Sequence, residues 1–276
     1  MIRKLKYAII ADIATFDLSY FDDQEESQSI DICNANGYTY LPSRCEKFVY
    51  KLENDHFKKV AIEMIDDNLK VNPSDLIFNS ETIAKFGKQF QNEVRFLIDK
   101  EEVKDKRGIR VIDKIIGVIH IVDYNNDFIS IELFKAILQF EKNLRQLLVM
   151  NGKNNNDFIS WVKEKAESAK QDSFWARRLY QLNQKKDERE NANPFQTFNL
   201  KELLQFAVNI NLLNKKDFNA QKIGDMRNLV AHNKDVVSKK EDEDSIVYLP
   251  KGLNVLAEQM KAFFKAYEIL AKKVKK

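Results

Sequence analysis

The sequence contains only two cysteines, Cys33 and Cys45, which lie twelve residues apart. No histidine or second cysteine pair accompanies them at the spacing of metal ligands, so the sequence indicates neither a zinc site nor a disulfide framework. We expect both cysteines to be free, buried thiols. Carboxylates at metal-ligand spacing are lacking too, and we expect neither a metal nor another cofactor for catalysis.

Long apolar runs are also lacking. No segment approaches the roughly 18 uninterrupted apolar residues that a membrane-spanning helix needs. Met1 to Lys6 lead into a mixed segment rather than into the apolar core of a signal peptide. We therefore expect a cytoplasmic protein with no membrane partner. With 276 residues, 44% hydrophobic and 11% aromatic, the chain can form one large or two ordinary packed domains.

The charged residues are unevenly distributed. Residues 1–125 contain 18 Lys and Arg against 22 Asp and Glu, whereas residues 126–276 contain 27 against 20. The overall formal charge of +3 therefore hides a C-terminal half with a charge of +7. Such a half suits a polyanionic partner, although lysines on solvated helix faces and in the tail at 272–276 contribute to the excess.

Helical periodicity dominates the C-terminal half. Residues 131–150 place apolar side chains at three- and four-residue spacing, with Glu141 and Arg145 one turn apart. Further helices are predicted over 198–213, from 223 onward and over 252–274, with polar loops at 151–157, 185–194 and 238–244. The sequence thus predicts an all-α bundle here.

The most informative segment runs from Ile223 to Lys234. Its apolar residues follow helical spacing, and Arg227, Asn228 and His232 interrupt them. Arg227 and His232 would lie roughly 140° apart around such a helix. One copy therefore makes an open, half-formed site, whereas two copies related by a two-fold axis would gather two arginines and two histidines in one cleft.

An arginine and a histidine together suit cleavage of a phosphodiester without a metal. Histidine exchanges protons near neutrality, and a guanidinium binds phosphate oxygens in a bidentate fork. The run from Arg227 to His232 resembles the R-N-x-x-x-H signature of the HEPN superfamily, all-helical domains many of which are ribonucleases with a composite site at a dimer interface. Phe140 to Arg145 resembles the first long helix of that family, where a similar acidic-then-basic pair recurs.

The resemblance implies a metal-independent endoribonuclease that acts as a homodimer on RNA. Arg227, Asn228 and His232 would be catalytic, with Glu141 and Arg145 in support. A toxin or antiphage effector would fit, with an antitoxin or a regulatory nucleotide as a further partner. Two alternatives stay open: a non-catalytic HEPN-type module that dimerises and binds RNA or a partner, and a purely structural dimeric scaffold.

Residues 1–125 are typical of a mixed α/β module. Strands are predicted over 38–42, 47–52, 57–62, 94–98 and 115–122, with a hairpin turn at 53–56 and a helix over 82–90. The order helix, strand and two more strands is predicted twice, at a spacing of roughly 55 residues, which indicates an internal repeat.

This half also carries a resemblance. Val111 to Tyr124 resembles the closing strands and helix entry of a CBS motif, and Tyr40-Leu41-Pro42 resembles the leucine-proline strand of the first motif of a pair. Paired CBS motifs bind adenine nucleotides or related ligands, and an aspartate at the end of the last strand holds the ribose; Asp123 matches that position. His120 stands where the family usually has Ser or Thr, so the ligand class stays open. The alternative is a small scaffold that only dimerises.

One further segment, Phe174 to Tyr180, interleaves aromatic residues with Arg177 and Arg178. This pattern suits base stacking and phosphate binding, although the same residues at helical spacing also suit a core with a solvated edge. The fold we expect is α+β: a CBS-like regulatory module over 1–125, a short turn at 124–128, and a HEPN-like helical domain over 126–276.

Overall fold

The structure, a computed structural model, describes residues 2–86, 93–105, 108–168, 174–184, 194–231, 235, 237–242, 245–249 and 251–275. The chain forms two compact units. Unit 1 comprises Arg3–Glu132 and Asn233–Glu258, and unit 2 comprises Leu133–His232 and Gln259–Lys276. Among the described residues, no helix is long and apolar enough to cross a membrane.

The first sheet of unit 1 is antiparallel. After the short helix α1 (Ile2–Lys6), helix α2 (Glu26–Asn36) precedes strands β1 (Tyr40–Pro42), β2 (Phe48–Glu53) and β3 (His56–Ala61), which lie in the order β1-β2-β3. Asn54 and Asp55 both have positive φ, at 51° and 61°, as a tight turn that matches the twist of its strands requires. The predicted hairpin at 53–56 is confirmed.

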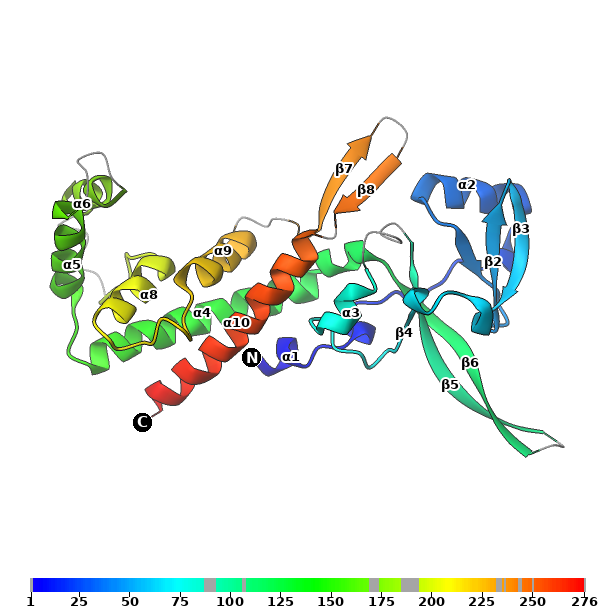
Figure 1. The fold of residues 1–276 in the computed structure, drawn as a ribbon, viewed down its shortest axis with the longest axis horizontal. Coiled ribbons are helices and arrows are strands. Elements are labelled where there is room, and N and C mark those ends of the chain that lie inside the picture. Colours follow the sequence, from blue (N-terminus) through cyan, green and yellow to red (C-terminus); the bar gives the residue numbers. More distant parts are fainter. Residues whose placement is uncertain are drawn as a thin grey trace. The chain divides into compact units, whose positions relative to one another are not determined.

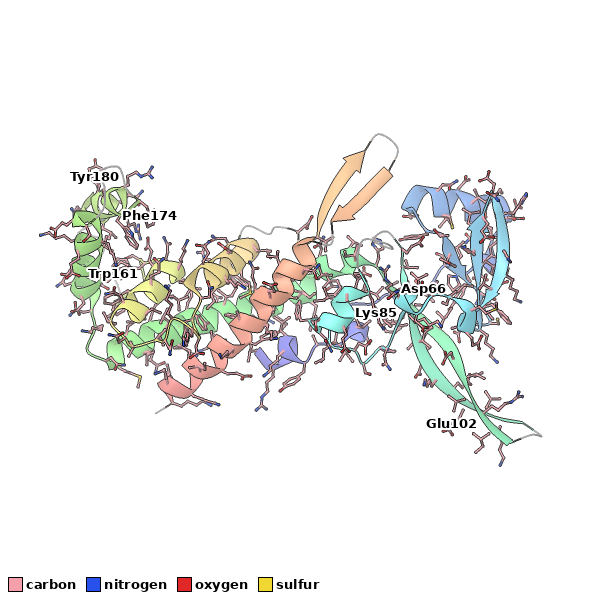
Figure 2. All side chains as sticks on the ribbon, in the orientation of Figure 1. Asp66, Lys85, Glu102, Trp161, Phe174 and Tyr180 are labelled. Atoms are coloured by element: carbon pink, nitrogen blue, oxygen red, sulfur yellow. The ribbon has the colours of Figure 1, made fainter. Side chains whose placement is uncertain are left out.

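The second sheet is mixed. Strand β4 (Lys70–Val71) pairs in parallel with β5 (Arg95–Asp105), which pairs antiparallel with β6 (Gly108–Ile119). The distal part of the β5–β6 hairpin is exposed and projects from the rest of unit 1, with Glu102 along it (Figure 1, Figure 2). A core cluster of the unit lies at the base of the hairpin, where buried residues of both sheets and of the segments next to them meet: Val49, Ile62, Ile65, Val94, Phe96 and Ile115.

Several predictions for this half need correction. The predicted internal repeat is wrong. The first sheet is antiparallel and follows a helix, whereas the second is mixed, and its elements come along the chain in the order β4, α3 (Ser80–Ala84), β5, β6. Strand β6 ends at Ile119 rather than at 122, because the chain turns into a 3-10 helix, η6 (Ile121–Asn125). The predicted helix at 82–90 starts earlier and ends at Ala84; residues 87–90 lie outside the described part. Cys33 is buried as expected, but Cys45 is exposed.

Unit 2 is helical. It contains most of α4 (Asp127–Met150) and α10 (Lys251–Val274), together with α5 (Asn155–Glu167), α6 (Phe174–Gln184), α8 (Leu200–Asn209) and α9 (Ala220–Ala231) (Figure 1). Phe140 of α4 packs against the rings of Phe218, Phe263 and Tyr267. Much of the apolar periodicity that predicted these helices is the periodicity of their buried faces, although Phe134 and Leu138 of α4 are exposed.

The C-terminal half is mostly, not entirely, helical. Where a loop was predicted at 238–244, the chain forms an antiparallel hairpin of β7 (Ser238–Asp242) and β8 (Ser245–Leu249). Asn125 fixes the approach to this hairpin, because its side chain accepts a hydrogen bond from the backbone N–H of Val237 and donates one to its carbonyl. The charged residues of β7 concealed the strand, because lysine, glutamate and aspartate are uncommon in strands.

Candidate functional site

Helix α9 contains most of the segment from Ile223 to Lys234, which carries the predicted catalytic residues. The side chain of Asn219 accepts a hydrogen bond from the backbone N–H of Lys222 and so caps the start of the helix. Ile223 and Met226 are buried. This anchoring fixes the rotation of the helix, so the side chain of Arg227 is 42% exposed and Asn228 is exposed beside it.

A carboxylate on α4 faces Arg227. One oxygen of Glu141, Oε1, lies 3.9 Å from Arg227 Nε, and the other, Oε2, accepts a hydrogen bond of 3.1 Å from Arg145 Nη2. Arg145 Nε also donates to the carbonyl oxygen of Phe195 at 3.2 Å. The Glu141 side chain is only 12% exposed. Glu141 thus accepts a hydrogen bond from Arg145, which is itself anchored, and its other oxygen faces the more exposed Arg227.

The structure brings four of the five predicted site residues of this half together. Arg227 Nη1 is 3.5 Å from Asn228 Oδ1, the long limit of a hydrogen bond. The predicted catalytic residue His232 lies outside the described residues, the last of which in α9 is Ala231. Arg227, Asn228, Glu141 and Arg145 therefore form the described part of the candidate site.

A pocket of about 400 Å³ opens beside Arg227 and Asn228. Helices α6, α8 and α9 line it with Phe174, Trp175, Asn199, Leu200, Lys201, Glu202, Gln205 and Gly224. Gly224 lets α8 approach closely, since a Cβ there would lie 3.1 Å from the Cβ of Lys201. The site thus continues from the ion pair into a space that combines aromatic, amide and basic side chains.

A buried ion pair behind this pocket was missed from the sequence. Arg178 Nη2 donates to Glu202 Oε2 at 2.8 Å, and Arg178 Nε lies 2.7 Å from Glu202 Oε1. Glu202 is 3% exposed, so its charge requires this partner. The signal in the sequence was an acidic residue on the apolar face of the helix at 198–213. The pair ties α6 to α8 and neutralises the one carboxylate among the described lining residues.

A second pocket, of about 300 Å³, lies in unit 1 and includes the predicted ligand residue Asp123. Tyr38, Tyr40 and His120 line it as well, and Asp17 adds a second carboxylate. Of the described residues that line it, none is lysine or arginine. This electrostatic setting suits an uncharged or cationic group better than a phosphate.

Asp123 itself has a structural role. It lies in η6, not at the end of a strand, and its Oδ2 accepts a hydrogen bond of 2.7 Å from the backbone N–H of His120. Burial raises the pKa of the Asp123 carboxyl, and the hydrogen bond from His120 opposes that shift. The residue thus stabilises the turn after β6 and also contributes to the pocket.

No group of three or more His, Cys, Asp and Glu residues in the described part of the chain is arranged to hold a metal ion. Comparisons with models of protein families, with curated proteins and with solved structures find no match to this chain. Any assignment of function therefore depends on the chemistry of the two sites.

Proposed function

We propose that this chain is a metal-independent endoribonuclease whose catalytic site is centred on Arg227. The observation that supports this most is the placement of Arg227 between Glu141 and the 400 Å³ pocket. Glu141 approaches the Nε side of the guanidinium. In the proposed complex the terminal nitrogens would form a fork with the oxygens of a phosphate.

The reaction follows from the residue types. The ribose 2′-hydroxyl attacks the adjacent phosphorus, the bond from phosphorus to the 5′-oxygen breaks, and a 2′,3′-cyclic phosphate forms. His232 takes the proton from the 2′-hydroxyl or gives one to the leaving 5′-oxygen, and Arg227 stabilises the charge on the phosphoryl oxygens. Asn228 orients the phosphate. Glu141 and Arg145 are positioning residues that hold Arg227.

A second copy of the chain completes the site in this proposal. A single histidine cannot at once accept the proton of the nucleophile and supply that of the leaving group, whereas a two-fold axis would bring in a second histidine and a second arginine. We therefore expect a homodimer formed through the helical unit. If sedimentation showed only monomer at micromolar concentration while cleavage remained intact, the proposal of a composite site would be wrong.

The test is cleavage of mixed cellular RNA in the presence of a chelator. The protein should cut it and leave cyclic phosphate ends, and a DNA copy should resist. His232→Ala should lose about 10²- to 10⁴-fold in rate, and Arg227→Lys should also fail because an ammonium lacks the fork geometry. Cleavage that stops in chelator, or that persists in folded His232→Ala, would contradict the mechanism.

The alternative is a non-catalytic module that binds RNA or a partner. The same observation favours it, since an arginine half-exposed beside a pocket serves binding as well as catalysis. The two functions differ in one result: the binding module would bind RNA through Arg227 and leave it intact.

The pocket in unit 1 is the proposed regulatory site. Its tyrosines suit a purine ring, and Asp123 and Asp17 suit ribose hydroxyls. Because the described lining has two carboxylates and no lysine or arginine, the adenosine part of a nucleotide would enter and its phosphates would remain outside. In this proposal ligand binding in unit 1 restrains or triggers the nuclease, as expected for a toxin or antiphage effector.

A further inference from the structure

We infer that the pocket lined by α6, α8 and α9 is a base-binding subsite that takes one unpaired nucleotide of the RNA. This inference rests on the proposed ribonuclease function and specifies its substrate as single-stranded RNA. The subsite comprises Phe174 and Trp175, which receive the base, and Lys201 and Arg227, which receive its phosphate.

The aromatic side of the subsite is Phe174 with Trp175. Their rings are 5.1 Å apart and nearly perpendicular, and Trp175 also packs edge-to-face on Trp161 of α5 at 5.0 Å. Trp175 is thereby fixed, while Phe174 stays 57% exposed. An exposed ring supported by an anchored one provides a stacking surface for a base, at little cost in side-chain entropy.

The same pocket has a basic part. Lys201 and Arg227 both line it, and the carboxylate of Glu202 is already paired with Arg178. The described lining is therefore positive overall. Helix α8 begins at Leu200 in this lining, which adds the positive end of its dipole. These features favour a phosphate oxygen near Arg227.

The amides supply the remaining contacts. Asn199, Gln205 and Asn228 line the pocket, and Asn199 makes no side-chain capping bond to α8. Amide side chains both donate and accept hydrogen bonds, as the edges of a base require. A volume of about 400 Å³ lies within the range of small-ligand sites and suits one nucleotide, not a duplex.

The position of the subsite relates it to the reaction. Arg227 and Asn228 belong both to the pocket and to the proposed catalytic group. A base held on Phe174 would therefore lie next to the phosphate that is cut. Bases inside a duplex are not free to enter, so the enzyme should select loops and single strands.

Binding can be measured apart from cleavage with a fluorescein-labelled, 2′-O-methylated RNA of about 12 nucleotides, which lacks the nucleophile. By fluorescence anisotropy the full-length protein should bind this strand more tightly than its duplex. Phe174→Ala should raise the Kd about 5- to 150-fold, and Phe174→Tyr should retain binding. In a Trp161→Phe background, in which Trp175 is the only tryptophan, the strand should quench tryptophan fluorescence.

The matched control is Tyr180→Ala. Tyr180 lies on the same helix, is 66% exposed and is not among the residues that line the pocket (Figure 2). The Tyr180→Ala variant should bind the RNA strand with the affinity of the parent protein, and melting curves should show that all variants are folded. Equal loss in both variants, or equal affinity for strand and duplex, would overturn the subsite. Binding that depends on Phe174 without any cleavage of unmodified RNA would instead retain the subsite and refute the ribonuclease. Cleavage of unmodified RNA that is unchanged by Phe174→Ala would instead retain the ribonuclease and refute the subsite.

Discussion

Glu141 Oε1 lies 3.9 Å from Arg227 Nε, so a carboxylate on α4 faces the arginine of α9. The same carboxylate is held by Arg145 at 3.1 Å. In the proposed catalytic site this largely buried carboxylate would orient the half-exposed guanidinium and would at the same time reduce its effective positive charge.

Replacing Glu141 separates these two effects. Glu141→Gln should lower kcat, about 10-fold or more, because Arg227 loses its orientation. It should also lower KM, because a negative charge near the RNA phosphate is removed. Steady-state kinetics on a short RNA measures both. Glu167→Gln is the control, since Glu167 forms an exposed pair with Lys163 on α5. A change in KM alone would leave Glu141 with a purely electrostatic role.

Ligand binding in unit 1 should depend on the nucleoside more than on the phosphates. Adenosine should raise the melting temperature at least as much as ATP does, and Asp123→Ala should reduce the rise. Thermal shift with both ligands at equal concentration is the measurement. Asp67→Asn, at a carboxylate with 94% side-chain exposure, is the control. A response to ATP alone would mean that a cation outside the described lining binds the phosphates.

Stability should depend on pH through Asp123. Its folded pKa is raised by burial, so between the unfolded pKa, near 3.8, and the folded one the native state holds more protons. The free energy of unfolding contributed by this group therefore falls as pH rises through that window. Asp123→Asn keeps an oxygen for the His120 N–H and should flatten this dependence. Urea unfolding from pH 3.5 to 7 would show it, and parallel curves for parent and variant would contradict it.

Arg95 should be a major stabilising residue of unit 1. Its side chain is fully buried, donates to the carbonyl of Lys85 at 2.9 Å and also to the carbonyl of Glu93, and stacks on Phe86. Burial lowers its pKa to about 10, against an opposing effect of Glu93. Arg95→Ala should lower the free energy of unfolding by about 2–4 kcal/mol, because a cavity forms and partly buried carbonyls lose their donors.

Chemical denaturation measures this loss, and Arg44→Ala is the control. Arg44 pairs with Asp23 at an exposed position, so its removal should change stability little. Equal effects of the two substitutions would mean that the backbone carbonyls near Arg95 find water instead.

The sequence by itself determined the local elements. Apolar spacing predicted the helix ending at Met150 and the one at 252–274, and it placed Arg227 and Asn228 on a helix, because a helix buries the residues that share its period. The turn at 53–56 was likewise predictable, since Asn54 and Asp55 tolerate positive φ. These features depend on neighbours along the chain.

Only the tertiary structure decided which residues of different helices and strands come into contact. The contact of Glu141 with Arg227, the burial of Glu202 against Arg178 and the pairing of β7 with β8 join residues that no local period relates. The turn of the chain after Ile119 is of the same kind, because Asp123 leaves the strand to cap η6 at His120. Such contacts are selected by packing and by the cost of burying unpaired charge, which a single segment does not encode.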